Sequence, residues 1–81
     1  PMVTLQILGG RKEKSRPGDV LGALTAETGG RQFTREQVGK ITVTDQSTYV
    51  AIAREIAHEA VRKLSLGKVK GKTVKVRALE D

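Results

Sequence analysis

The sequence contains no cysteine and no tryptophan, and it has a single histidine. Without cysteine the chain can form neither a disulfide nor a thiolate metal site, and a cytoplasmic location is the default expectation. No apolar run approaches the roughly 18 residues that a membrane-spanning helix needs. The start of the chain also lacks the charged-then-apolar pattern of a signal peptide. We therefore expect no membrane partner, no metal and no cofactor.

The length of 81 residues allows one domain with a single small core, and leaves little room for a deep catalytic cleft. We interpret residues 1–81 as a single domain taken from a longer protein, with a cloning remnant in the opening Pro-Met dipeptide. We expect this domain to be monomeric.

Positive charge is concentrated in two short segments. The chain carries 15 Lys and Arg against 9 Asp and Glu, a net charge of +6. Residues 11–16 (RKEKSR) sum to +3 and residues 67–77 to +5, whereas residues 18–66 hold six bases and six acids and the tail 80–81 supplies −2. Charge runs are usually only solvated. Their confinement to two segments nevertheless favours a surface that binds a polyanion, above all a nucleic acid.

Hydrophobic periodicity predicts four strands and two helices. Alternating residues indicate strands over 3–7, 40–44, 48–52 and 74–77, the middle two forming a hairpin. Helices are expected from Pro17 to about position 28 and from 53 to 66. The second helix should bury one stripe (Ile56, Ala57, Ala60, Val61, Leu64) and expose the other (Glu55, His58, Glu59, Arg62, Lys63).

The resulting order, β-α-β-β-α-β, predicts an α+β domain of the RRM-like split β-α-β type. In this architecture a four-stranded antiparallel sheet carries both helices on one face. The last strand then runs antiparallel beside the first, so the loop after the first strand meets the loop before the last. We therefore expect the two basic segments to form one patch, whose members are Arg11, Lys12, Lys14, Arg16, Lys68, Lys70 and Lys72.

The segment GKVKGKT (67–73) resembles a nucleotide-binding phosphate loop but differs from it in two ways. Only three residues separate its glycines, where the G-x-x-x-x-G-K-[ST] motif has four. A phosphate loop also follows a strand and opens a helix, whereas this segment follows a helix and precedes a strand. His58, Glu55 and Glu59 lie on an outer helix face and suggest no catalytic constellation. We expect a domain that is not itself an enzyme.

The open face of the predicted sheet should be polar and basic, with one aromatic residue, Tyr49. RNA-recognition modules usually stack bases on two or three aromatic side chains. Tyr49 could stack on a base, or it could simply be a surface residue that favours a strand. Recognition led by phosphate contacts and RNA shape is the expectation that follows.

Four segments together resemble a known family: GRKEKSRPGDVLGALT (10–25), VGKITV (38–43), TYVAI (48–52) and GKVKGKTVKVR (67–77). They are similar to the C-terminal RNA-binding domain of DbpA-type (DbpA/YxiN-like) bacterial DEAD-box RNA helicases. The resemblance implies a degenerate RNA-recognition fold behind two helicase-core domains that hold the ATPase. It further implies that the domain tethers the ATP-dependent helicase to 23S ribosomal RNA, near hairpin 92, during assembly of the large subunit. The RNA contacts it implies are Arg11, Lys12, Lys14, Arg16, Lys40, Tyr49, Lys68, Lys70 and Lys72.

Three alternatives stand beside this interpretation. The first is the RNA-binding domain of another DEAD-box helicase, with a looser preference for structured RNA. The second is a ferredoxin-like protein-interaction module, which would need an exposed apolar patch. The third is an acylphosphatase-like hydrolase, which would want an Arg/Asn phosphate site, although the chain contains no asparagine.

Overall fold

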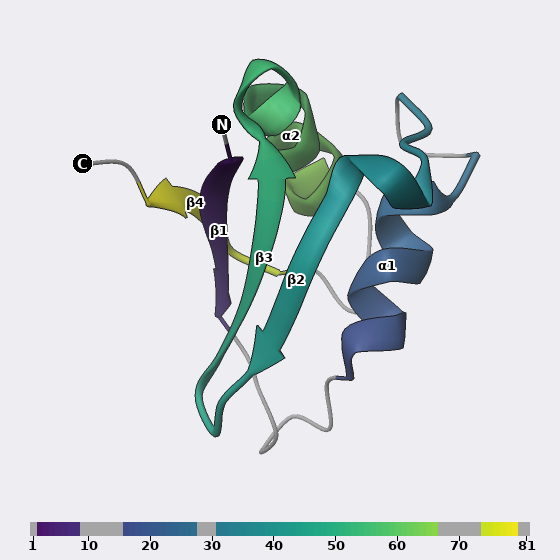
Figure 1. Ribbon diagram of the computed structural model, residues 1–81. Coiled ribbons are helices and arrows are strands. Elements are labelled where there is room, and N and C mark those ends of the chain that lie inside the picture. Colours follow the sequence, from purple (N-terminus) through teal and green to yellow (C-terminus); the bar gives the residue numbers. More distant parts are fainter. Residues whose placement is uncertain (1, 9–15, 28–30, 67–73, 80–81) are drawn as a thin grey trace.

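The computed structural model describes residues 2–8, 16–27, 31–66 and 74–79. The elements follow the expected order and confirm the RRM-like fold class (Figure 1). They are β1 (Met2–Leu8), α1 (Pro17–Thr25), η2 (Arg35–Gln37), β2 (Val38–Val43), β3 (Ser47–Ala53), η3 (Arg54–Ile56), α2 (Ala57–Leu66) and β4 (Val76–Leu79).

The four strands form one antiparallel sheet in the order β2-β3-β1-β4. The central strands β1 and β3 pair along their whole length, from Met2 opposite Ala53 to Leu8 opposite Ser47. β4 closes one edge of the sheet beside β1, and β2 closes the other (Figure 1). The predicted pairing of the first strand with the last is therefore confirmed.

One face of the sheet is buried under both helices. Leu5, Val50 and Ile52 are fully buried on this inner face, and Val20 and Leu24 of α1 belong to the same core as Leu64 of α2. Alternation along each strand sends every second side chain inward. The helices lie behind and to the right of the sheet in Figure 1. None of the described helices is long and apolar enough to cross a membrane.

The helix α1 begins at Pro17, as predicted, but it is shorter than predicted. Pro17 takes the first helical position, and the Arg16 backbone N–H donates to Asp19 Oδ2 at 3.0 Å. The helix ends at Thr25, before the predicted end near position 28, because Ala26 is extended. The backbone carbonyl of Leu24 then accepts from the Phe33 N–H at 3.1 Å. Position 28 itself lies outside the described residues.

The prediction that Lys63 is exposed on α2 is wrong. Its side chain is buried, and its ammonium donates to the carbonyl oxygen of Ala26 at 2.7 Å. A cation is favourable at this position because the last carbonyls of a helix carry partial negative charge. Lys63 thus joins the two helices, a tertiary contact that the amphipathic pattern of α2 does not reveal.

β2 begins at Val38, two residues earlier than predicted, and contains an irregularity between Val38 and Ile41. Gly39 sits in this bulge, where a Cβ atom would lie 3.0 Å from the Ala51 Cβ. A larger residue would therefore press on β3. β4 begins at Val76, two residues later than predicted.

Candidate nucleic-acid interface

The nine predicted contact residues fall into two groups. The structure describes Arg16, Lys40 and Tyr49, and the other six lie outside the described residues: Arg11, Lys12, Lys14, Lys68, Lys70 and Lys72. Arg16 is exposed at the start of α1, and Lys40 is exposed in the bulge of β2. Tyr49 is half-buried in the central strand β3. These three residues come from three separate elements.

The end of β1, which precedes the first basic segment, is hydrogen-bonded to the described end of the second basic segment. Ile7 pairs with Val76, and the backbone N–H of Leu8 donates to the carbonyl oxygen of Lys75 at 3.0 Å. In the sequence, residues 9–15 follow Leu8 directly, and residues 67–73 end just before Val74. The pairing of β1 with β4 therefore places the residue before positions 9–15 beside the strand that follows positions 67–73, as the predicted patch requires.

A row of side chains crosses the open face of the sheet at one level. The register aligns Thr42, Tyr49, Gln6 and Arg77 across β2, β3, β1 and β4. Gln6 Nε2 donates to Ser47 Oγ at 3.1 Å and lies 3.4 Å from the Tyr49 hydroxyl. Its Oε1 accepts from Arg77 Nε at 2.9 Å. One amide thereby orients the aromatic residue and the guanidinium at once.

Alternation along the strands assigns Gln6 and Arg77 to the open face, but neither was among the predicted contacts. Their hydrogen bond depends on the antiparallel register of β1 and β4, which brings two residues that are distant in sequence to the same level. The sequence alone does not predict this hydrogen bond, because the register of β1 against β4 must be known first.

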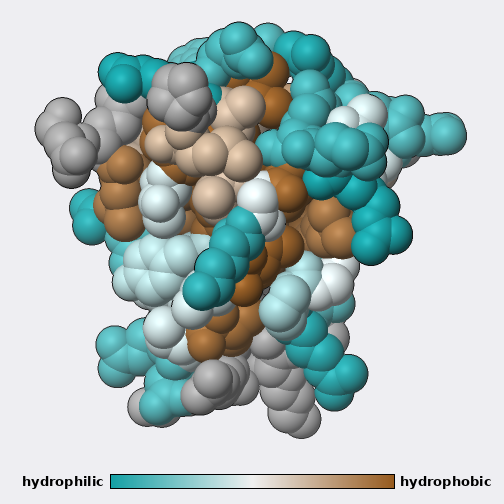
Figure 2. All heavy atoms as spheres, viewed as in Figure 1, coloured by the Kyte–Doolittle hydropathy of each residue, from teal (hydrophilic) through white to brown (hydrophobic). Residues whose placement is uncertain are grey.

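The open face is less polar than predicted. Met2, Leu8 and Leu79 are 54%, 53% and 38% exposed. The register places all three on the same side as Gln6 and Arg77. Figure 2, in the view of Figure 1, shows tan and brown apolar surface between pale and teal polar side chains. The prediction of a polar and basic face is therefore corrected, because Met2 and Leu8 at the two ends of β1 and Leu79 on the edge strand β4 add apolar surface.

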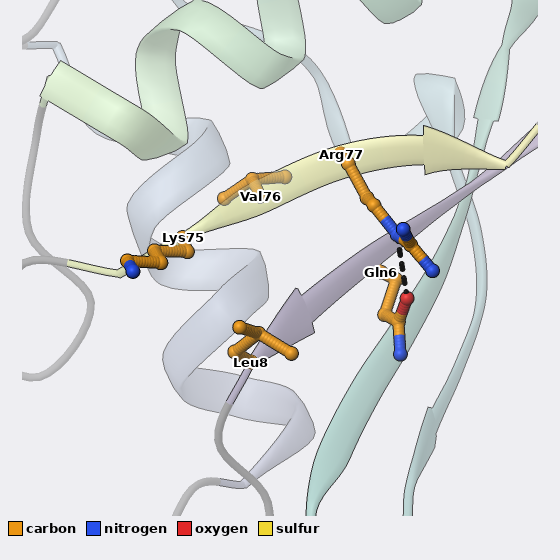
Figure 3. Close-up of a pocket in the computed structure, with 5 residues that line it drawn as sticks. All are labelled: Gln6, Leu8, Lys75, Val76 and Arg77. Atoms are coloured by element: carbon orange, nitrogen blue, oxygen red, sulfur yellow. Dashed lines mark hydrogen bonds between the residues drawn. The ribbon is translucent and has the colours of Figure 1, made fainter.

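A hollow of about 380 Å³ lies between β1 and β4, lined by Gln6, Leu8, Lys75, Val76 and Arg77. Figure 3 shows Gln6 and Leu8 along β1, with the Arg77 side chain reaching across from β4 to Gln6. Two cations and an exposed leucine are among its described lining residues, none of which is acidic. Such a surface suits a ligand with an apolar ring and negative charge.

The chemistry elsewhere in the described ranges does not point to catalysis. His58, Glu55 and Glu59 are exposed, and Glu59 pairs with Arg31 at 3.2 Å. Phe33 is buried in the core beneath Arg31, whose guanidinium carbon lies 5.6 Å from the ring centroid. Within residues 2–8, 16–27, 31–66 and 74–79, no group of three or more His, Asp or Glu could hold a metal ion.

Comparison with known proteins adds evidence that the geometry alone cannot give. The family described as "DbpA RNA binding domain" matches residues 4–78 of the chain. The chain belongs to this family. The resemblance drawn from the four sequence segments is thereby confirmed, and the chain is an RNA-binding domain of the DbpA type.

A curated relative is the ATP-dependent RNA helicase DbpA of Escherichia coli (strain K12), which is 49% identical over 79 residues. The alignment covers 98% of this chain but only 17% of the relative. The similarity thus extends over the whole β-α-β-β-α-β domain, from β1 to β4.

Proposed function

We propose that this domain tethers an ATP-dependent DEAD-box RNA helicase to structured ribosomal RNA. Membership of the DbpA RNA-binding family supports an RNA ligand. The similar helicase is almost six times as long as the matched region, since the alignment covers 17% of it. In this proposal the helicase core belongs to the same polypeptide, acts in the cytoplasm, and performs the ATP-dependent chemistry, while this domain only binds.

The pairing of β1 with β4 carries the proposed mode of binding. The hydrogen bond from Leu8 to Lys75 joins the end of β1, which precedes residues 11–16 with a net charge of +3, to residues 67–77 with a net charge of +5. Lysine and arginine that neutralise phosphates release condensed counterions, and this release supplies most of the sequence-independent affinity. In the proposed complex, Arg11, Lys12, Lys14, Arg16, Lys68, Lys70 and Lys72 contact RNA phosphates.

The open face would then orient the captured RNA. Lys40 is exposed on β2, and Tyr49 presents the only aromatic ring among the described residues of the open face. Folded RNA offers unstacked bases in loops and bulges, which proteins read by stacking and by hydrogen bonds to base edges. We therefore assign Lys40 to a phosphate contact and Tyr49 to a base contact.

The specific target that we propose is 23S ribosomal RNA in the region of hairpin 92, in the assembly of the large subunit. A fluorescence titration of the chain with a hairpin 92 fragment tests this target. The matched control is a hairpin of equal length and stem composition with a scrambled loop. We expect at least a tenfold preference for the hairpin 92 fragment, about 1.4 kcal/mol of discrimination.

Equal affinity for both hairpins would favour the alternative, a domain with a looser preference for structured RNA. Failure to bind either hairpin would contradict the proposed function altogether. This second result is the one expected if the domain is a protein-interaction module. Such a module needs exposed apolar surface, which Met2, Leu8 and Leu79 provide.

A further inference from the structure

We propose that the hollow between β1 and β4 binds one unpaired nucleotide of RNA, with a preference for guanosine. The inference deepens the proposed function and rests on it. The hollow measures about 380 Å³, within the range of roughly 300–1,000 Å³ typical of small-molecule sites. It lies at the end of the sheet where the Leu8 N–H donates to the carbonyl oxygen of Lys75, a residue of the second basic segment.

The first argument is the fixed orientation of Arg77. Its Nε donates to Gln6 Oε1 at 2.9 Å, and Gln6 is itself held by Ser47 at 3.1 Å. The plane of the guanidinium is thereby set, whereas its two terminal nitrogens make no hydrogen bond within the described ranges. A guanidinium fixed in this way presents a donor fork that matches a pair of acceptors.

The second argument is the composition of the lining. Leu8 is 53% exposed and offers an apolar surface for a base, while the exposed Lys75 adds a second positive charge. None of the described residues that line the hollow carries a carboxylate that would repel a phosphate. Figure 3 shows Leu8 and Gln6 along β1 and the Arg77 side chain reaching from β4 to Gln6, and all three residues line the hollow.

The preference for guanosine follows from the chemistry of the fork. Guanine presents two adjacent acceptors, O6 and N7, to which arginine donates in bidentate fashion. Adenine offers one acceptor and one donor on that edge. Arginine has no acceptor of its own, so adenine would leave its amino group without a partner in the hollow.

A binding assay with labelled RNA duplexes tests this site. One probe has blunt ends, a second carries a short unpaired uridine overhang, and a third has one guanosine within that overhang. We expect the affinity of the wild-type chain to rise from the first probe to the third. Arg77→Lys keeps the charge but removes the fork, and should lower the preference for the guanosine probe over the blunt duplex by about tenfold.

Leu8→Ala should lower the preference for both overhang probes over the blunt duplex, because it removes the surface against the base. The control variants are Arg62→Lys and Leu66→Ala on α2, where both side chains are exposed. All four altered side chains are exposed. Thermal melting checks that each variant is folded. Blunt-duplex affinity should change by less than about twofold in every variant. The lysine of each Arg→Lys variant retains a positive charge for phosphate contact, and the Leu→Ala variants change no charge.

Equal affinity of the wild-type chain for all three probes would overturn the nucleotide site, and so would equal losses on every probe in the Arg77 and Leu8 variants. Equal affinity for the two overhang probes would overturn the preference for guanosine. Displacement of overhang RNA by a polyglutamate peptide from the wild-type chain, but not from Arg77→Lys, would assign the hollow to an acidic peptide instead. The proposed function fails separately, by loss of hairpin binding.

Discussion

The two faces of the central strands β1 and β3 differ in composition, burial and role. On the inner face, Leu5, Val50 and Ile52 are fully buried against the helices. On the open face, Gln6 links Tyr49 and Arg77 through polar contacts near solvent. Successive residues of one strand thus serve different purposes, because the strand alternates its side chains between the two faces.

This difference separates stability from recognition in so small a domain. The inner face supplies the apolar burial that offsets the conformational entropy of folding. The open face supplies groups whose removal leaves the core intact. A substitution on one face should therefore change the free energy of unfolding, and a substitution on the other should change the affinity for RNA.

The largest expected effect lies on the inner face. Leu5→Ala removes a fully buried side chain and should lower the free energy of unfolding by about 2–5 kcal/mol, because it leaves a cavity in the core. Urea denaturation measures this change. The neighbouring substitution Thr4→Ala, on the exposed side of the same strand, is the matched control and should cost less than about 0.5 kcal/mol. Similar losses in both variants would remove the distinction between the faces.

A smaller effect is expected on the open face. Tyr49→Leu should weaken binding of the hairpin 92 fragment by about tenfold, because base–aromatic stacking contributes about 1–3 kcal/mol. Its free energy of unfolding should fall by less than about 1 kcal/mol, since only one cross-strand pair changes. Fluorescence titration and urea denaturation of the same samples provide the two values. An unchanged affinity would mean that Tyr49 is only a strand-favouring surface residue.

Much of the fold could be predicted because it depends on local patterns. The alternation of Val3, Leu5 and Ile7 identifies β1 and its inner face, and Pro17 with Asp19 marks the start of α1. The order of elements then leads to the neighbouring positions of β1 and β4. Each of these inferences uses residues close in sequence together with general rules of chain connection.

The features that escaped prediction depend on contacts between distant residues. Lys63 is buried with its ammonium donating a hydrogen bond to the carbonyl oxygen of Ala26, 37 residues away. Gly39 lies in the irregular part of β2, so close to Ala51 of the neighbouring strand that an added Cβ atom would be 3.0 Å from the Ala51 Cβ. The bond between Gln6 and Arg77 spans 71 residues. Periodicity within a segment contains no information on such pairs, so only the assembled sheet and helices reveal them.

The salt dependence of RNA affinity tests the central claim, that basic segments brought together by β1 and β4 bind RNA phosphates. The variant to compare with the wild-type chain is Lys12→Glu with Lys70→Glu, one substitution in each segment. Its control is Arg35→Glu with Arg62→Glu, which makes the same charge change at exposed sites outside the segments.

We predict that the logarithm of the wild-type association constant for the hairpin 92 fragment falls linearly with the logarithm of salt concentration, by about 0.7–0.9 per neutralised phosphate. The Lys12 and Lys70 variant should bind weakly, with a slope reduced by about 2, whereas the control should keep the wild-type slope. A wild-type affinity that is independent of salt, or equal slopes in the two double variants, would contradict the claim.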